Sequence, residues 1–172
     1  PKDYRNDVTL NNLVMSVDPD CSPELTAMLG SAIATAISDI PFDGPCATTQ
    51  IGMVGGFFVV NPNEEQMAVS DLKLTVASTR DKVIMIEAGA NEIPDEKMIE
   101  AIYKADSVNK EIIAFIDKIV AEVGKEKHAY TAFVIPEELT SAIKEIVPPQ
   151  EMEVAVFTDE KQVREENIKA IT

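Results

Sequence analysis

The stretch from residue 22 to residue 45 constrains the fold most, because it has the pattern of one well-packed helix that ends in a turn. Ser22 can cap the helix, and Pro23 suits its first position. Apolar residues recur at helical spacing from Leu25 to Ile40, and most of the positions between them are small. A helix of this kind can be packed closely on more than one side. The sequence therefore predicts a buried helix that ends in a turn.

Segments rich in β-forming residues lie on both sides of this helix. They comprise residues 8–17, 46–54, 57–60, 72–78 and 83–88. Gly55 and Gly56 separate the second segment from the third, which predicts a hairpin with a two-residue turn. The order of elements is β-α-β-β-β-β, and one helix on a mostly antiparallel sheet is an α+β arrangement.

The character of the chain changes near residue 91. Helical patterns with Pro and acidic residues at their starts cover residues 94–123 and 136–147, and a charged helix is expected over residues 159–171. No strand pattern follows Gly89. We therefore expect two domains, an α+β domain over residues 1–91 and an all-helical domain over residues 92–172.

Charge and composition exclude several classes of protein. The formal net charge of the 172 residues is −15, which opposes binding to a phosphate backbone. No apolar run reaches the ~20 residues that a membrane helix needs, and the first residues are polar, unlike a signal peptide. Cys21 and Cys46 form no CxxC motif, which is typical of reduced thiols in a cytoplasmic protein. Because the chain begins with Pro1, we expect it to be a fragment of a longer protein.

Few residues are candidates for chemistry. His128 is the only histidine, lies in a polar connection and is not expected to be catalytic. Glu64, Glu65 and Asp71 form the best acidic cluster, which either holds a metal ion or is a solvated loop with helix-favouring acids. Composition and spacing alone lead no further than an α+β lobe with a helical appendage.

Longer motifs resemble a known family. SVDPDCSPELTAMLGSAIATAISDIPFDGP, IGMVGGFFVVNP and LKLTVAST followed by VIMIEAGANEI are similar to bacterial polynucleotide phosphorylases. The resemblance is to the second half of the first RNase PH-like core, followed by the helical linker domain. It implies that the fold is the β-α-β-β-β-β half of such a core followed by an all-α domain.

The resemblance also implies a function for the parent protein. The family degrades RNA from the 3′ end, with inorganic phosphate as the attacking group and nucleoside diphosphates as the products. Its members are cytoplasmic homotrimers, and neither DNA nor a membrane is an expected partner. The family's divalent metal, Mg²⁺ or Mn²⁺, lies in the second core, outside this chain, so no cofactor is expected here.

Positions that match the family's second-core active site carry the wrong side chains here. When the family's V-A-G-T is aligned with residues 76–79, its two key carboxylates fall on Met67 and Lys73 and its lysine falls on Thr75. Asp71 is the only matching acid. Since a thioether and an ammonium cannot replace carboxylates as ligands of a hard cation, no catalytic, cofactor-binding or metal-binding residue is expected. We therefore expect a non-catalytic, architectural piece of the ring, with an RNA-binding or metal-binding module in its own right as the alternative.

The same resemblance places neighbouring strands in a preceding half of the core. Without them, a sheet edge or an apolar face would be open, so we expect the chain alone to oligomerise or to be poorly soluble.

Overall fold

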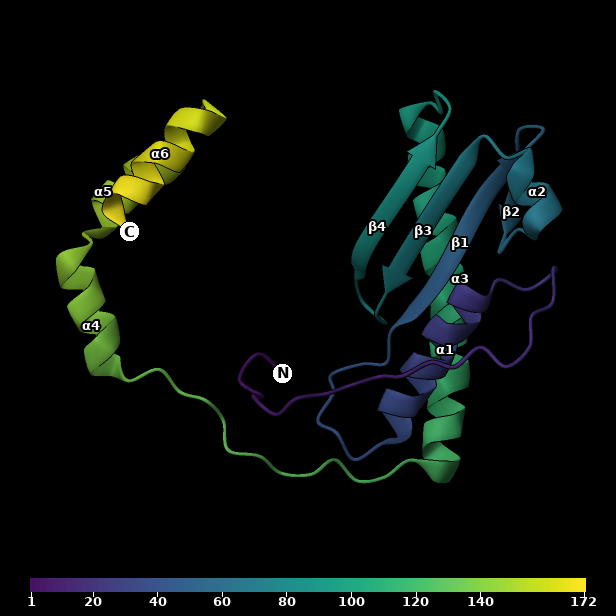
Figure 1. Cartoon of the computed structure of the whole chain (residues 1–172), viewed down its shortest axis with the longest axis horizontal. Coiled ribbons are helices and arrows are strands. Elements are labelled where there is room, and N and C mark those ends of the chain that lie inside the picture. Colours follow the sequence, from purple (N-terminus) through teal and green to yellow (C-terminus); the bar gives the residue numbers. More distant parts are fainter. The chain divides into compact units, whose positions relative to one another are not determined.

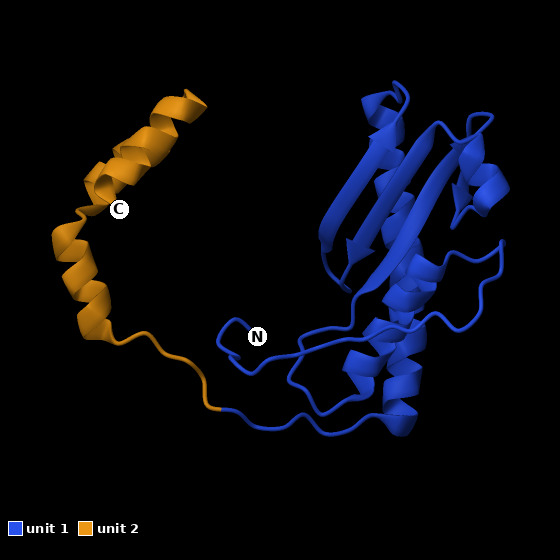
Figure 2. Ribbon diagram, in the orientation of Figure 1, with its two compact units in different colours: residues 1–130 blue, residues 131–172 orange.

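The computed structural model describes residues 1–172, which form two compact units, residues 1–130 and residues 131–172 (Figure 2). The first unit contains the helix α1 (Pro23–Ile37), a four-stranded sheet, the short helix α2 (Glu64–Ala68) and the long helix α3 (Asp95–Val123). The second contains three helices. The α+β class expected from the sequence is confirmed.

The sheet is antiparallel throughout. Its strands are β1 (Ala47–Val54), β2 (Phe57–Val60), β3 (Leu72–Ser78) and β4 (Val83–Ala90), in the order β2-β1-β3-β4. The predicted hairpin is present, with Val54 opposite Phe57. Gly55 and Gly56 have φ values of 57° and 83°, and two positive φ values in succession are what a tight hairpin turn of this hand requires.

Helix α3 covers one face of the sheet and builds the main core (Figure 1). Alternate residues of the central strands point toward it, among them Ile51, Leu74 and Val76, which are completely buried. Ala101 and Ala105 of α3 lie against them, and these small side chains let the helix approach the sheet closely. The apolar residues of alternate strand positions and those of one face of α3 thus form one buried layer between the sheet and the helix.

Helix α1 begins as predicted. The Ser22 side chain accepts a hydrogen bond from the Leu25 N–H at 3.3 Å, and Pro23 is the first helical residue. Its Ala32 and Ala36 pack against Ile116 of α3 in a second buried cluster. The small residues of α1 therefore serve close packing between two helices, as the sequence suggested.

The strand expected over residues 8–17 is not formed. This segment is extended and exposed, and it belongs to none of the four strands of the sheet. A strand exists only where a neighbouring strand completes its hydrogen bonds, and β-propensity in the sequence cannot supply that neighbour. The prediction of a first strand was therefore wrong for this structure, and the observed order of the first unit starts at α1.

The edge strand β4 carries exposed apolar side chains. Val83, Ile84, Met85 and Ile86 are all exposed, and β4 pairs only with β3. Unpaired edges with apolar side chains favour association of chains. The expected oligomerisation or poor solubility stays a prediction.

The compact units do not divide at residues 91 and 92. Helix α3 belongs with the sheet because its apolar stripe packs on β1 and β3, so the first unit continues to residue 130. Charged residues become more frequent after residue 91 because the outer face of α3 is charged. Charge on one face of a helix does not indicate what its apolar face contacts. The division at residue 91 stays a prediction about the domains of the longer protein.

The second unit contains α4 (Glu137–Ile146), α5 (Pro149–Val156) and α6 (Lys161–Ile171). Helix α5, which packs against α6, was not predicted, because Pro148 and Pro149 read as the end of the preceding helix. Pro149 instead occupies the first turn of a new helix, where a missing N–H costs nothing. No helix of the structure is both long and apolar enough to cross a membrane.

Candidate functional site

The three positions that the family resemblance singled out meet in one polar cleft. Met67 and Lys73 line a pocket of about 490 Å³, and Lys73 and Thr75 line an adjacent pocket of about 470 Å³. We call the two pockets together the polar cleft. The residues that line both pockets are Ser22, Glu24, Gln50 and Lys73. Residues that are far apart in the sequence thus come together where the motif alignment placed a site.

Strand alternation places Lys73 and Thr75 in the cleft. Leu72 and Leu74 point into the core beneath α3, so Lys73 and Thr75 lie on the opposite face of β3. There the Gln50 side-chain amide donates a hydrogen bond to the Thr75 hydroxyl at 3.3 Å. The face of the sheet that lines the cleft is therefore polar and internally hydrogen-bonded.

Helix α2 brings Met67 to the cleft through a local capping box. The Asn63 side chain accepts from the Gln66 N–H at 2.9 Å, and the Gln66 side chain accepts from the Asn63 N–H at 3.1 Å. Asn63 also donates from Nδ2 to Asp20 at 3.0 Å, which ties the loop before α1 to the start of α2. The short helix is fixed in place by its cap rather than by burial, since none of its residues is buried.

The cleft is lined by one ammonium, that of Lys73, and by four carboxylates, those of Asp18, Glu24, Glu64 and Glu87. The Ser22 hydroxyl donates to Glu24 Oε2 at 2.7 Å. This hydrogen bond, together with one from the Glu24 backbone N–H and the nearby positive charge of Lys73, holds the pKa of the Glu24 carboxyl below its usual value. The Lys73 ammonium therefore compensates part of the negative charge at Glu24, and no three acidic side chains of the cleft have the arrangement of a metal site.

Removal of the Ser22 hydroxyl is expected to raise the pKa of Glu24. Because the folded-state pKa is lowered, this carboxylate favours the folded state above its ordinary pKa of 4.5, and that contribution disappears as the pH falls through the folded-state pKa. Ser22→Ala should therefore move the Glu24 titration, followed by ¹³C NMR of the side-chain carboxyl, to higher pH. Thr26→Ala is the matched control, since its hydroxyl bonds the Ser22 carbonyl instead. An unchanged Glu24 titration in Ser22→Ala would show that the hydroxyl does not set this pKa.

The acidic cluster of Glu64, Glu65 and Asp71 is not gathered into one site. Glu64 lines the cleft, Glu65 is exposed outside it, and Asp71 lies beyond the cleft beside Asn91, whose N–H donates to its backbone carbonyl at 2.9 Å. No group of three or more His, Cys, Asp or Glu side chains has the arrangement of a metal site.

His128 lies beside tyrosine and aspartate rather than beside a nucleophile. Its Nε2 is 3.2 Å from the Tyr4 hydroxyl, and its Nδ1 is 3.9 Å from Asp39. No serine or cysteine side chain is hydrogen-bonded to the ring, so the arrangement of a nucleophile and its base is missing. The prediction that this histidine lies in a polar connection agrees with its half-exposed position.

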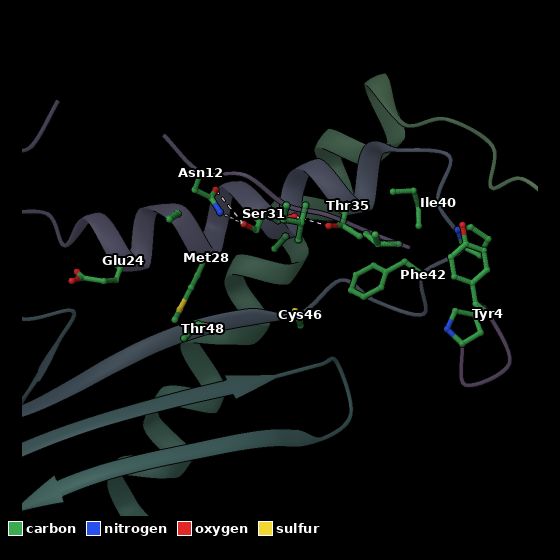
Figure 3. Close-up of a pocket in the computed structure, with 16 residues that line it drawn as sticks. Tyr4, Asn12, Glu24, Met28, Ser31, Thr35, Ile40, Phe42, Cys46 and Thr48 are labelled. Carbon is green, nitrogen blue, oxygen red and sulfur yellow. Dashed lines mark hydrogen bonds between the residues drawn. The ribbon is translucent and has the colours of Figure 1, made fainter. Parts of the chain in front are cut away.

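Sequence analysis missed a second, apolar pocket of about 670 Å³ (Figure 3). It lies between α1, the N-terminal segment and the chain that leads into β1, with Met28 and Phe42 pointing into it. Asn12 and Ser31 close one side, where Asn12 Nδ2 donates to Ser31 Oγ at 3.0 Å. The small residues of α1 were the only sequence signal for this pocket, because its other wall comes from a segment that was expected to be a strand.

Comparison with known proteins agrees with the motifs. The sequence model described as "3' exoribonuclease family, domain 2" matches residues 44–107. The polyribonucleotide nucleotidyltransferase of Lachnoclostridium phytofermentans is 76% identical over 99% of this chain, and that of Clostridioides difficile is 47% identical over 99%. The crystal structure of rice Rrp46 superimposes with a TM-score of 0.54 at 14% identity, covering 61% of this chain and 51% of that chain. At that identity the likeness shows the fold alone.

The matched region of the family model extends across residue 91 into α3, in agreement with the packing of α3 on the sheet. Each of the two bacterial relatives matches this chain over nearly all of its residues, and the chain spans 24% of the length of each. This chain therefore belongs to the polyribonucleotide nucleotidyltransferase family, as a segment about a quarter as long as those relatives.

Proposed function

We propose that this chain is a non-catalytic, architectural segment of a phosphorolytic 3′–5′ exoribonuclease. The longer protein would use inorganic phosphate to release nucleoside diphosphates from the 3′ end of RNA in the cytoplasm. The near-complete match to polyribonucleotide nucleotidyltransferases supports the reaction class of that longer protein. In this proposal, the segment is the second half of the first RNase PH-like core, followed by residues 92–172 as the helical linker domain.

The observation that carries the non-catalytic role is the composition of the polar cleft. Met67 lines one pocket of the cleft and Thr75 lines the other, and Lys73 lines both, so the aligned positions lie in one region of the surface. The side chains, however, are a thioether, an ammonium and a hydroxyl, and Lys73 places a positive charge where a metal ligand would need a negative one. The divalent metal, Mg²⁺ or Mn²⁺, would then be bound in the second core, where it would neutralise phosphate charge.

Partners of the longer protein follow from the same resemblance. RNA and phosphate are the expected substrates, and a homotrimeric ring is the expected assembly. Binding of RNA by this segment alone is disfavoured by its net charge of −15, because a polyanion must find a basic patch to bind. An architectural role needs no such patch.

An assay of ADP release tests the proposal. The purified chain, incubated with poly(A), inorganic phosphate and Mg²⁺, is expected to release no more ADP than a sample without phosphate. An intact polyribonucleotide nucleotidyltransferase under the same conditions is the positive control. Phosphate-dependent ADP from the chain alone, lost in Lys73→Met, would instead place an active site in the polar cleft.

A further inference from the structure

The chain that leaves α3 runs along the C-terminal end of α1. The Lys125 N–H donates to the Ile37 carbonyl at 2.9 Å, and the His128 N–H donates to the Asp39 carbonyl at 2.7 Å. We call residues 125–130 the strap. These two backbone hydrogen bonds hold it beside a helix end that lies almost ninety residues earlier in the sequence.

Lys127 is the main attachment of the strap. Its Nζ donates to three backbone carbonyls at the end of α1, those of Thr35 at 3.1 Å, Ala36 at 2.9 Å and Ser38 at 2.6 Å. Helix α1 has no basic residue in its own last turn. The positive charge beside the negative end of its dipole therefore comes from Lys127, which lies outside the helix. An ammonium uses all three of its donors here, and such charge-assisted hydrogen bonds are stronger than neutral ones.

The N-terminal residues attach to the same strap. Tyr130 donates its hydroxyl proton to Asp3 at 2.8 Å, and the Tyr4 hydroxyl lies 3.2 Å from His128. The rings of Tyr4 and Tyr130 meet edge to face with their centroids 5.0 Å apart. The beginning of the chain and the exit from α3 are therefore tied together at the end of α1.

We propose that the strap is a conformational device with a closed and an open state, and that Lys127 is the residue that closes it. In the closed state, residues 125–130 are ordered and the following segment starts from a fixed point at residue 131. In the open state, the ordered chain ends at Gly124, which is the C-cap of α3, and Asp3 and Tyr4 lose their contacts with Tyr130 and His128. This inference concerns the path of the chain and does not depend on the enzymatic proposal.

The strap can open without loss of the core. Residues 125–127 are exposed, and neither buried cluster of the first unit includes a residue of the strap. Its attachment is therefore made of hydrogen bonds and ring contacts at the surface, which is the kind of segment that opens locally in native proteins. A change at Lys127 should act on the strap alone.

Hydrogen exchange of the whole chain with and without the Lys127 ammonium tests the device. Lys127→Met keeps most of the aliphatic stem and removes the charge, and we expect the Lys125 and His128 amides to exchange about tenfold faster or more, given the strength of charge-assisted hydrogen bonds. Amides of β1 and β3 should keep their rates. Lys125→Met is the matched control, because only the backbone of Lys125 bonds α1, and Lys127→Arg should restore much of the protection.

Two results would overturn the proposal. If the Lys125 and His128 amides exchange at the same rates in Lys127→Met as in the native chain, the strap is held in place without the Lys127 ammonium. Equally faster exchange in β1 and β3 would mean that Lys127 supports the whole fold and that no separate open state exists. The NMR signals of Tyr4 give an independent readout, since they should shift in Lys127→Met and stay in place in Lys125→Met.

Discussion

Asn109→Ala is expected to destabilise the first unit by about 3 kcal/mol, because three hydrogen bonds inside the core depend on this side chain. Asn109 is completely buried in α3, facing the sheet. Thr49 donates to its Oδ1 at 2.7 Å, and its Nδ2 donates to the Val76 carbonyl at 3.0 Å and to the Ser78 hydroxyl at 3.1 Å. Alanine would leave these buried groups without their partner, and an unpaired buried polar group costs more than the net gain of a hydrogen bond.

Urea unfolding followed by circular dichroism measures this loss. Ser107→Ala is the matched control, since Ser107 is exposed on the same helix, and its free energy of unfolding should change by about 0.5 kcal/mol or less. A loss below about 1 kcal/mol in Asn109→Ala would show that water or a shifted side chain replaces the network.

Ile116→Ala is expected to have an effect of similar size, about 3–4 kcal/mol, because Ile116 is fully buried between α3 and α1. Its neighbours in this cluster include Ala32 and Ala36 of α1. These small side chains cannot swing in to fill the space that the isoleucine leaves, so a cavity should remain and the contact of α1 with α3 should weaken.

The effect should appear first in α1. Hydrogen exchange of the α1 amides should accelerate more than that of β3 amides, which lie in the other buried cluster. Phe115→Ala is the control, since Phe115 is the next residue and its side chain is 53% exposed. Equal stability of the two variants would mean that α1 is held by its contacts with β1 and the strap rather than by Ile116.

Local signals were sufficient where neighbouring residues decide the conformation. The capped start of α1 and the Gly55–Gly56 turn were predicted from residues that contact each other along the chain, and the structure has both. The four strands of the sheet follow from the same kind of signal. Helix α5 was missed for a local reason as well, because proline fits both the end of one helix and the first turn of the next.

The polar cleft was predictable in part. Alternation along β3 implies that Lys73 and Thr75 share a face, and the motif alignment connected them with Met67. The place of Glu24 opposite Lys73 was not predictable, because it depends on where the first turn of α1 lies over the sheet. The apolar pocket was missed because one of its walls is the N-terminal segment, which was expected to be a strand.

By itself, the sequence determined the family, the α+β class, and the strands and most of the helices, because motifs and periodicity are properties of neighbouring residues. Only the tertiary structure decided that residues 8–17 form no strand, that α3 belongs with the sheet, and that Lys127 caps α1. Each of these depends on a partner distant in the sequence: a neighbouring strand, an apolar face, or a helix end with free carbonyls. Such partners cannot be identified from neighbouring residues, because only the folded chain brings them within hydrogen-bonding or van der Waals distance.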